Sequence, residues 1–251
     1  MLYRMEKLIG LSITASDGEI GKVKDVYFDD QHWAVRYLVV ETGGWLDHIK
    51  VLVSPFAVRR IDWDGGSVHV HLTRAQVKGS PSVDTDRPVS RQQELEFSRH
   101  YGYPGYWSGA LLWGDTPYLT MPSGPVSVAN DSRPGCAAAA ADAHLRSAKQ
   151  VIGYHLQATD AAIGHVEDFL VEDESWAIRY LVIDTRNWWP GKHVVIPPQW
   201  ISTVDWAGQS LHMNVTRYNV THAPEYDPAV EFTRPEEASL YRHYERANYW
   251  D

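Results

Sequence analysis

Hydrophobic and polar residues follow one another in short runs through the first half of the chain, a pattern typical of β-strands. The runs EIGKVKDVYFDD, WAVRYLVVET, HIKVLVSP and AVRRIDWDGGSVHVHLT are rich in valine, isoleucine and aromatic residues. Turn-forming residues accompany them, with Asp29-Asp30-Gln31-His32 between the first two runs and Asp64-Gly65-Gly66 inside the last. About six short strands at such close spacing predict a small barrel or sandwich.

The same pattern occurs a second time in the chain. WAVRYLVVET at residues 33–42 returns as WAIRYLVIDT at residues 176–185, an offset of 143 positions that also matches Ile9 with Ile152 and Trp107 with Trp250. The chain is therefore a tandem duplication of a unit of about 100 residues, the size of one small domain. We expect the first repeat at residues 1–108 and the second at residues 144–251.

The segment between the repeats, residues 109–143, has a different composition. It is rich in glycine, proline, serine and alanine and has no counterpart before the first repeat. This composition favours a linker. As an alternative, Leu111-Leu112-Trp113 and Tyr118-Leu119 dock on a barrel.

Each repeat ends in a segment with the signals of a short helix. SRQQELEFSRHYGYPGYW and TRPEEASLYRHYERANYW begin with Ser90 and Thr233, which acidic or amide residues follow three to four positions later. The two tails keep the offset without a gap, whereas surface segments usually drift in length after duplication. We therefore expect the tails to lie at the joint of an internal pseudo-dimer; the alternative is that each packs on its own barrel. The candidate interaction residues are Arg99, His100, Tyr101, Trp107, Arg242, His243, Tyr244 and Trp250.

The run VRYLVV is apolar on both faces, so we expect its strand to be covered on both sides. The order DGEIGKVKDVYFD, WAVRYLVVETGGWL, KVLVSPFAV and IDWDGGSVHVHLT resembles the PRC-barrel domain. That domain is named after the cytoplasmic part of the photosynthetic reaction centre H subunit and is shared with the C-terminal half of the ribosome maturation factor RimM. The resemblance covers about residues 6–80 and 149–223. It implies a mainly β chain with two small PRC-type β-barrels, each followed by a short helix.

Composition narrows the class of partner. With 44% hydrophobic and 22% charged residues the repeats have the composition of ordinary globular domains, and the net charge of −9 argues against binding to a nucleic-acid backbone. The single cysteine, Cys136, cannot form an internal disulfide, which favours a reducing compartment. No apolar run approaches the ~20 residues of a membrane helix. We expect a bacterial-type cytoplasmic protein, with peripheral contact at the inner face of the membrane as an open alternative.

Histidines suggest a metal site only weakly. His69 and His71 are spaced to lie on one face of a strand, and the second repeat has His212 and Asn214 at these positions. Zinc requires three or four ligands. We therefore interpret the pair as a solvated strand face and expect no metal and no cofactor.

Asp25 and Arg36 are retained as Asp168 and Arg179. If the first hairpin turns at Asp30-Gln31, Asp25 lies directly opposite Arg36, where an ion pair contributes roughly 0.2 to 1 kcal/mol. We therefore expect a structural ion pair in each repeat. In the functional alternative, Asp25 is a general base beside an anion clamp formed by Arg36.

Tryptophan is abundant, with eleven residues. Trp33, Trp45, Trp63 and Trp107 match Trp176, Trp188, Trp206 and Trp250, and residues that recur in this way are expected in the core and in packing between domains. Trp113, Trp189 and Trp200 have no counterpart and are the candidates for surface recognition.

The sequence lacks the motifs of nucleophilic hydrolases, phosphate-binding loops, zinc proteases and dinucleotide-binding folds. We therefore expect no catalytic residues and a non-catalytic interaction or scaffold protein with a protein partner. One alternative is a peripheral accessory of a membrane complex like the reaction centre. The other is a small-molecule binder or enzyme that uses Asp25 and Arg36.

Overall fold

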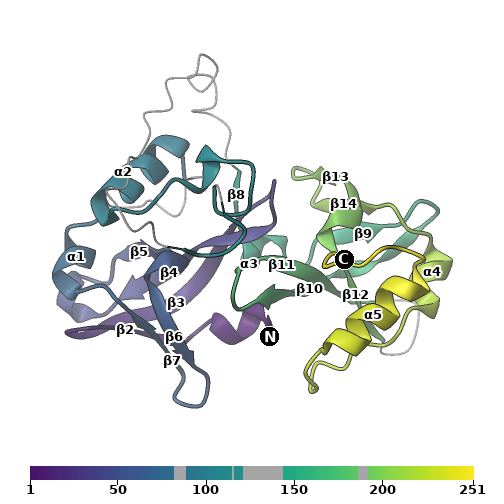
Figure 1. The fold of residues 1–251 in the computed structure, drawn as a ribbon, viewed down its shortest axis with the longest axis horizontal. Coiled ribbons are helices and arrows are strands. Elements are labelled where there is room, and N and C mark those ends of the chain that lie inside the picture. The colour runs from purple at the N-terminus through teal and green to yellow at the C-terminus, as the bar shows by residue number, and fades with distance from the viewer. Residues whose placement is uncertain (82–88, 115, 121–143, 186–191) are drawn as a thin grey trace. The chain divides into compact units, whose positions relative to one another are not determined.

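The computed structural model describes residues 1–81, 89–114, 116–120, 144–185 and 192–251 (Figure 1). The chain forms two compact units. The repeat-1 unit comprises Lys7–Ala148 and Glu174–Ala177, and the repeat-2 unit comprises Met1–Glu6, Lys149–Asp173 and Ile178–Asp251. Each unit is thus built mainly from one repeat and completed by short segments that belong to the other repeat.

The repeat-1 unit contains a mixed sheet of seven strands. Six follow the order β5-β4-β3-β2-β7-β6, and β8 pairs with β3 beside this path. The pairs are antiparallel except for the parallel pair of β2 with β7. The strands are β2 (Ser12–Ala15), β3 (Gly18–Asp29), β4 (Ala34–Thr42), β5 (Lys50–Val53), β6 (Val58–Asp62), β7 (Ser67–Val70) and β8 (Leu145–Ser147). Among the described residues, the pairing does not close the sheet into a ring.

The repeat-2 unit has the same strand order, β12-β11-β10-β9-β14-β13, with β1 paired to β10. Its strands are β1 (Leu2–Arg4), β9 (His155–Gln157), β10 (Ala162–Glu172), β11 (Ile178–Asp184), β12 (His193–Ile196), β13 (Ile201–Asp205) and β14 (Ser210–Met213). The prediction of a mainly β chain with two similar barrel-like units is confirmed.

The seventh strand of each sheet comes from the other repeat. β1 is the first strand of the first repeat but pairs with β10, where Leu2 lies opposite Glu172. β8 is the first strand of the second repeat but pairs with β3, where Leu145 lies opposite Asp29. The two pairings are equivalent at the offset of 143, so the exchange of strands is reciprocal and in the same register.

Short helices complete the units. They are α1 (Arg74–Lys78), α2 (Arg91–Tyr101), α3 (Ala148–Val151), α4 (Arg217–His222) and α5 (Arg234–His243), with 3-10 turns at Met5–Leu8, Gly44–Leu46, Pro55–Ala57, Tyr106–Ser108 and Pro198–Trp200. Helix α2 begins after Ser90 and α5 after Thr233, and both carry a capping box, as the sequence predicts. Helix α1 has the same signal in Thr73 and Gln76, which the strand interpretation of this segment missed.

In the repeat-1 unit, α2 covers the face of the sheet formed by β3, β4 and β5 (Figure 1). The buried side chains at this junction are Tyr27, Tyr37, Val39, Leu52, Val89, Phe97 and Leu145. Strand β4 is buried along nearly its whole length, which confirms that it is covered on both faces. Leu145 belongs to the exchanged strand, so β8 contributes to the core as well as to the sheet.

Candidate functional site

A polar cluster of retained residues lies in the repeat-1 unit, between α2 and the residues after it up to Trp107. These residues after the helix are called the tail below. Glu94 on α2 is fully buried, accepts a hydrogen bond from the hydroxyl of Tyr106, and forms an ion pair with Arg91 at 3.1 Å. The guanidinium of Arg91 also lies over the ring of Trp107, 4.5 Å from its centroid. The cluster therefore ties the tail back onto the first turn of its own helix.

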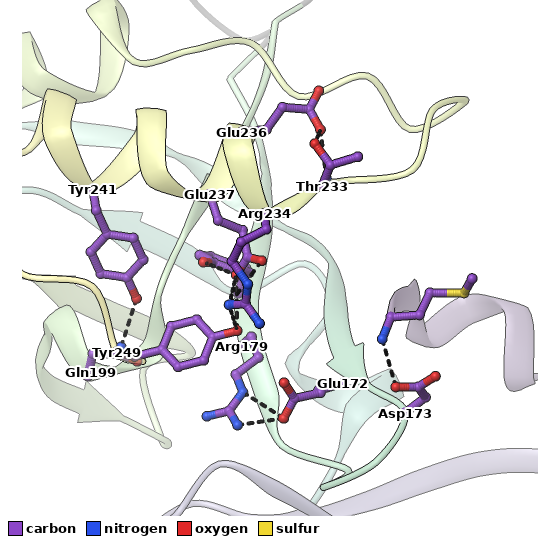
Figure 2. A network of polar contacts seen from close by, with 12 residues as sticks. Glu172, Asp173, Arg179, Gln199, Thr233, Arg234, Glu236, Glu237, Tyr241 and Tyr249 are labelled. Carbon is purple, nitrogen blue, oxygen red and sulfur yellow. Dashed lines mark hydrogen bonds and ion pairs between the residues drawn. The ribbon is translucent and has the colours of Figure 1, made fainter. Parts of the chain in front are cut away.

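The repeat-2 unit builds the same cluster from the equivalent residues (Figure 2). Glu237 accepts hydrogen bonds from the hydroxyls of Tyr180 at 2.8 Å and Tyr249 at 3.0 Å. Arg234 pairs with Glu237 at 3.3 Å, and its guanidinium lies 4.3 Å from the ring of Trp250. The tail after α5 is held in the same way.

Burial shifts the pKa values of the acidic groups in the repeat-1 cluster. It raises the pKa of Glu94 to about 7, because the loss of hydration outweighs the favourable effects of Arg91 and of the Tyr106 hydroxyl on the charged form. Burial, with the neighbouring Glu94 carboxylate, also raises the pKa of Tyr106 and of Tyr37 well above the usual range. Both phenols are thus neutral hydrogen-bond donors at neutral pH.

The arrangement is suited to holding structure together. A general acid or base must reach its substrate, within hydrogen-bond distance or through one water. The cavity beside Tyr106 and Arg36 has a volume of about 10 Å³, enough for about one water molecule.

A larger cavity lies in the repeat-2 unit next to Glu237, with a volume of about 290 Å³. Its lining combines carboxylates with one guanidinium and consists of Met1, Leu2, Glu172, Glu231, Phe232, Thr233, Arg234, Glu237 and Tyr249. It is large enough to admit a small molecule, but its buried carboxylate, Glu237, is already engaged by two tyrosines and Arg234.

The predicted pairing of Asp25 with Arg36 across the hairpin is wrong. Asp25 lies opposite Val39, and Asp168 lies opposite Val182. Beside the turn the pairing is two positions from the expected register, with Asp29 opposite Ala34, and a bulge between Tyr27 and Phe28 shifts it by one more. The two members of the suggested base and anion clamp are therefore not cross-strand neighbours.

Each retained arginine instead binds the acid seven positions before it. Arg36 donates from Nε to Asp29 at 2.5 Å, and Arg179 donates from Nη2 to Glu172 at 2.5 Å. Arg36 also donates from Nη1 to the main-chain oxygen of Leu112 at 2.7 Å. The arginines are thus structural, as expected, but with other partners.

Each retained aspartate holds the exchanged strand. One oxygen of Asp25 accepts the main-chain N–H of Val26 at 2.8 Å, and the other accepts the hydroxyl of Ser147 on β8 at 2.5 Å. Asp168 accepts the N–H of Phe169 at 2.8 Å and Nε of Arg4 on β1 at 2.9 Å. Arg4 and Ser147 are equivalent positions, so strand exchange accounts for the retention of both aspartates.

Of the eight candidate interaction residues, Tyr244 is buried, three are exposed and four are partly buried. His100 and His243 contact the main-chain oxygens of Gln76 and Asn219, at 2.9 and 2.7 Å. Tyr101 stacks on Phe97 and Tyr103, and Tyr244 packs on Trp200. Arg99 and Arg242 lie on the exposed sides of α2 and α5. These contacts account for much of the retained sequence within each repeat, and the joint of a pseudo-dimer stays a prediction.

The expectations for the tryptophans need correction. Trp113 and Trp200, candidates for surface recognition, are each only 4% exposed, whereas Trp63, expected in the core, is 39% exposed. Trp188 and Trp189 lie outside the described residues. The alternative prediction was that the start of the linker docks on a barrel. It is correct for Leu112 and Trp113, which contact Arg36 and Phe56.

His69 contacts Arg60 at 3.0 Å and Ser67 at 3.2 Å. Within the part of the chain that the structure describes, no three histidine, cysteine or acidic residues are grouped as metal ligands. No helix in that part is both long and apolar enough to cross a membrane.

The buried glutamates are the residues that sequence reasoning missed. Glu94 and Glu237 match at the offset of 143, as do Tyr37 with Tyr180 and Arg91 with Arg234. The signal was therefore present: a charged residue retained on the apolar side of a predicted helix, beside a retained arginine three positions earlier.

Comparison with known proteins identifies the class. Residues 2–77 match the family model of the PRC-barrel domain. An uncharacterized protein of Deinococcus radiodurans is 31% identical over 104 residues, which cover 37% of this chain and 37% of that protein, so the match spans little more than a third of the relative's length. The first repeat therefore carries a PRC-barrel domain. The second repeat has the same strand order, so the two similar sheets are consistent with a tandem PRC-barrel protein.

Proposed function

We propose that the chain is a non-catalytic scaffold protein that uses its two PRC-type units to bind protein partners. One observation carries this proposal: four acidic residues retained in both repeats are engaged in contacts that hold parts of the units together. Glu94 and Glu237 hold the tails, and Asp25 and Asp168 hold the exchanged strands. Groups used in this way support a rigid framework.

The exposed sides of the C-terminal helices are the proposed contact surfaces. Arg99 on α2 and Arg242 on α5 are equivalent and exposed, on a chain whose net charge is −9. Arginine is enriched in protein interfaces, where its planar group pairs with carboxylates and aromatic rings. The proposed partner is a protein with an acidic or aromatic patch, and the proposed location is the cytoplasm, including the inner face of the membrane.

The test uses a photo-crosslinking amino acid in the full chain, at Arg99 in one variant and at Arg242 in a second. Irradiation in extract of the source cells should give discrete adducts with one or a few proteins. The matched control carries the same group at Lys78, which is exposed on α1. Adducts no stronger than those of the control, or turnover of a metabolite by the purified chain, would refute the proposal. Fractionation of the adducts separates a soluble partner from a membrane-bound one.

A further inference from the structure

The residues after the first tail form a tight turn that inserts a tryptophan into the repeat-1 unit. Leu111 and Gly114 pair with each other through main-chain hydrogen bonds of 2.8 and 3.2 Å. The turn presents the main-chain oxygen of Leu112 to Arg36 at 2.7 Å. The indole N–H of Trp113 donates to the main-chain oxygen of Ser175 at 2.7 Å. Two directed hydrogen bonds and one large apolar side chain are how a short peptide is recognised.

The pocket that receives the indole is aromatic and contains a buried cation. Trp113 lies edge-on to Phe56, with ring centroids 5.0 Å apart, and Phe56 stacks on Tyr103 at 5.5 Å. The guanidinium of Arg36 lies between two rings, 3.9 Å from the centroid of Tyr106 and 4.5 Å from that of Trp113. With Trp113 in place, the remaining space is about 10 Å³, so the indole fills the pocket.

The fold does not require this pocket. At the positions of Phe56 and Tyr103 the second repeat has Gln199 and Arg246, and it builds the same sheet and the same tail. Trp113 also lies beyond the tail, which is already closed by Tyr106 on Glu94. Aromatic residues at positions where the fold accepts polar ones indicate a binding role.

Arg36 supplies a second and independent indication. Its side chain is fully buried, with Nε on Asp29 and Nη1 on Leu112. Its Nη2 has no hydrogen-bond partner among the described residues. An unsatisfied buried donor costs free energy, and a ligand with one more acceptor than the turn would satisfy it.

We propose that the pocket of Arg36, Phe56, Tyr103 and Tyr106 is a binding site for a tryptophan-bearing turn of a partner protein, and that Leu111–Gly114 occupies it in cis. The inference rests on the proposed role in binding partners and names a partner class at a site distinct from Arg99 and Arg242. Because the segment is tethered, its effective concentration is of millimolar order, so a partner must displace it. The cis turn thus lowers the apparent affinity of the pocket for a partner.

The test measures binding of the synthetic peptide GALLWG, the sequence of residues 109–114, to the full chain. In the variant Trp113→Ala the pocket is vacated, and the peptide should bind about tenfold or more tightly than to the unaltered chain, because the competing cis state is removed. The peptide GALLAG is the matched control and should not bind. Adding Phe56→Gln, the residue that the second repeat uses, should abolish binding of GALLWG.

A measurement on the unaltered chain covers the case in which Trp113→Ala does not fold. Excess GALLWG should shift the NMR signal of the Trp113 indole N–H, because that group leaves Ser175, whereas GALLAG should not. A folded Trp113→Ala chain that ignores GALLWG, or an indole signal that no excess of peptide moves, overturns the proposal. Because these experiments need no cellular partner, their failure leaves the crosslinking result at Arg99 and Arg242 untouched.

Discussion

The two repeats place the same residues around the same buried glutamate, yet they surround it differently. Glu237 accepts two tyrosine hydroxyls and pairs with Arg234, whose side chain is half exposed. Glu94 has the hydroxyls of Tyr106 and Tyr37 as partners and pairs with Arg91, which is largely buried. The other retained pair of arginines shows the same difference in burial: the side chain of Arg36 is 0% exposed and that of Arg179 is 27% exposed. The fold fixes the positions of these residues, whereas the residues packed around them determine how far each charge is buried.

The reciprocal exchange of β1 and β8 is the feature that both units share most closely, and it predicts the largest effect. Cutting the chain between Gly124 and Ala141 should leave two fragments that stay together in native buffer, because each fragment contains a strand of the other unit. Size-exclusion chromatography should give a single peak at the mass of the whole chain, and separation should require denaturant. Two separate folded fragments would contradict the exchange.

The family model adds to this comparison, since it begins at residue 2 and so includes β1. The matched region therefore contains β1 as well as β2 to β7, although β1 pairs with β10 of the other unit's sheet. Exchange of an identical element between equivalent copies is typical of swapped dimers. Here the same exchange occurs within one chain.

Glycine at one equivalent position is the next most sensitive feature. A Cβ on Gly21 would lie 2.0 Å from the main-chain oxygen of Glu41, and one on Gly164 would lie 2.2 Å from that of Asp184. Backbone atoms of a paired strand cannot move away, so each change to alanine should lower the free energy of unfolding by about 3 kcal/mol or more. Chemical denaturation measures this loss. Gly43→Ala, whose Cβ would meet only the Trp45 side chain at 3.6 Å, is the control and should cost far less.

The sequence predicts the strands and the helix caps well, because alternation and a Ser90 or Thr233 cap are local signals. The strand register was wrong mainly because the hairpin closes with Asp29 opposite Ala34, two positions from the expected pairing. A bulge between Tyr27 and Phe28 adds one more position, and a bulge leaves no mark in the hydrophobic pattern. The exchange was not predictable for a related reason. LYR and LRS are three-residue strands whose local pattern is the same whichever sheet they join. The buried glutamates needed the repeats to be compared position by position.

The burial of Glu94 in the first repeat can be tested through the pH dependence of stability. Burial raises the pKa of Glu94 from its ordinary value of 4.5 to about 7, so the folded chain binds one more proton than the unfolded chain between these values. Stability contributed by this group is therefore present below pH 4.5 and is lost as pH rises through about 7, a change of about 3 kcal/mol at most. Relative to the unaltered chain, Glu94→Gln should gain stability as pH rises from 5 to 8.

Thermal unfolding across this pH range measures the gain. Glu96→Gln, exposed on the same helix, should run parallel to the unaltered chain. If the gap between Glu94→Gln and the unaltered chain is constant from pH 5 to 8, Glu94 does not titrate in this window.

The smallest expected effects compare the two aspartates that hold the exchanged strands. Asp168 is fully buried and receives the Arg4 guanidinium, whereas Asp25 is partly exposed and receives the neutral hydroxyl of Ser147. The contact of Asp168 with Arg4 joins two opposite charges, so its loss leaves a largely buried guanidinium without its partner, whereas the contact of Asp25 with Ser147 has one charged partner. Asp168→Asn should therefore destabilise the chain more than Asp25→Asn. Urea denaturation with Ser147→Ala in the Asp25→Asn background separates the contact from the residue: the second change should cost little once the first is made, since both remove the same bond. Fully additive losses would mean that Asp25 stabilises the unit through something other than β8.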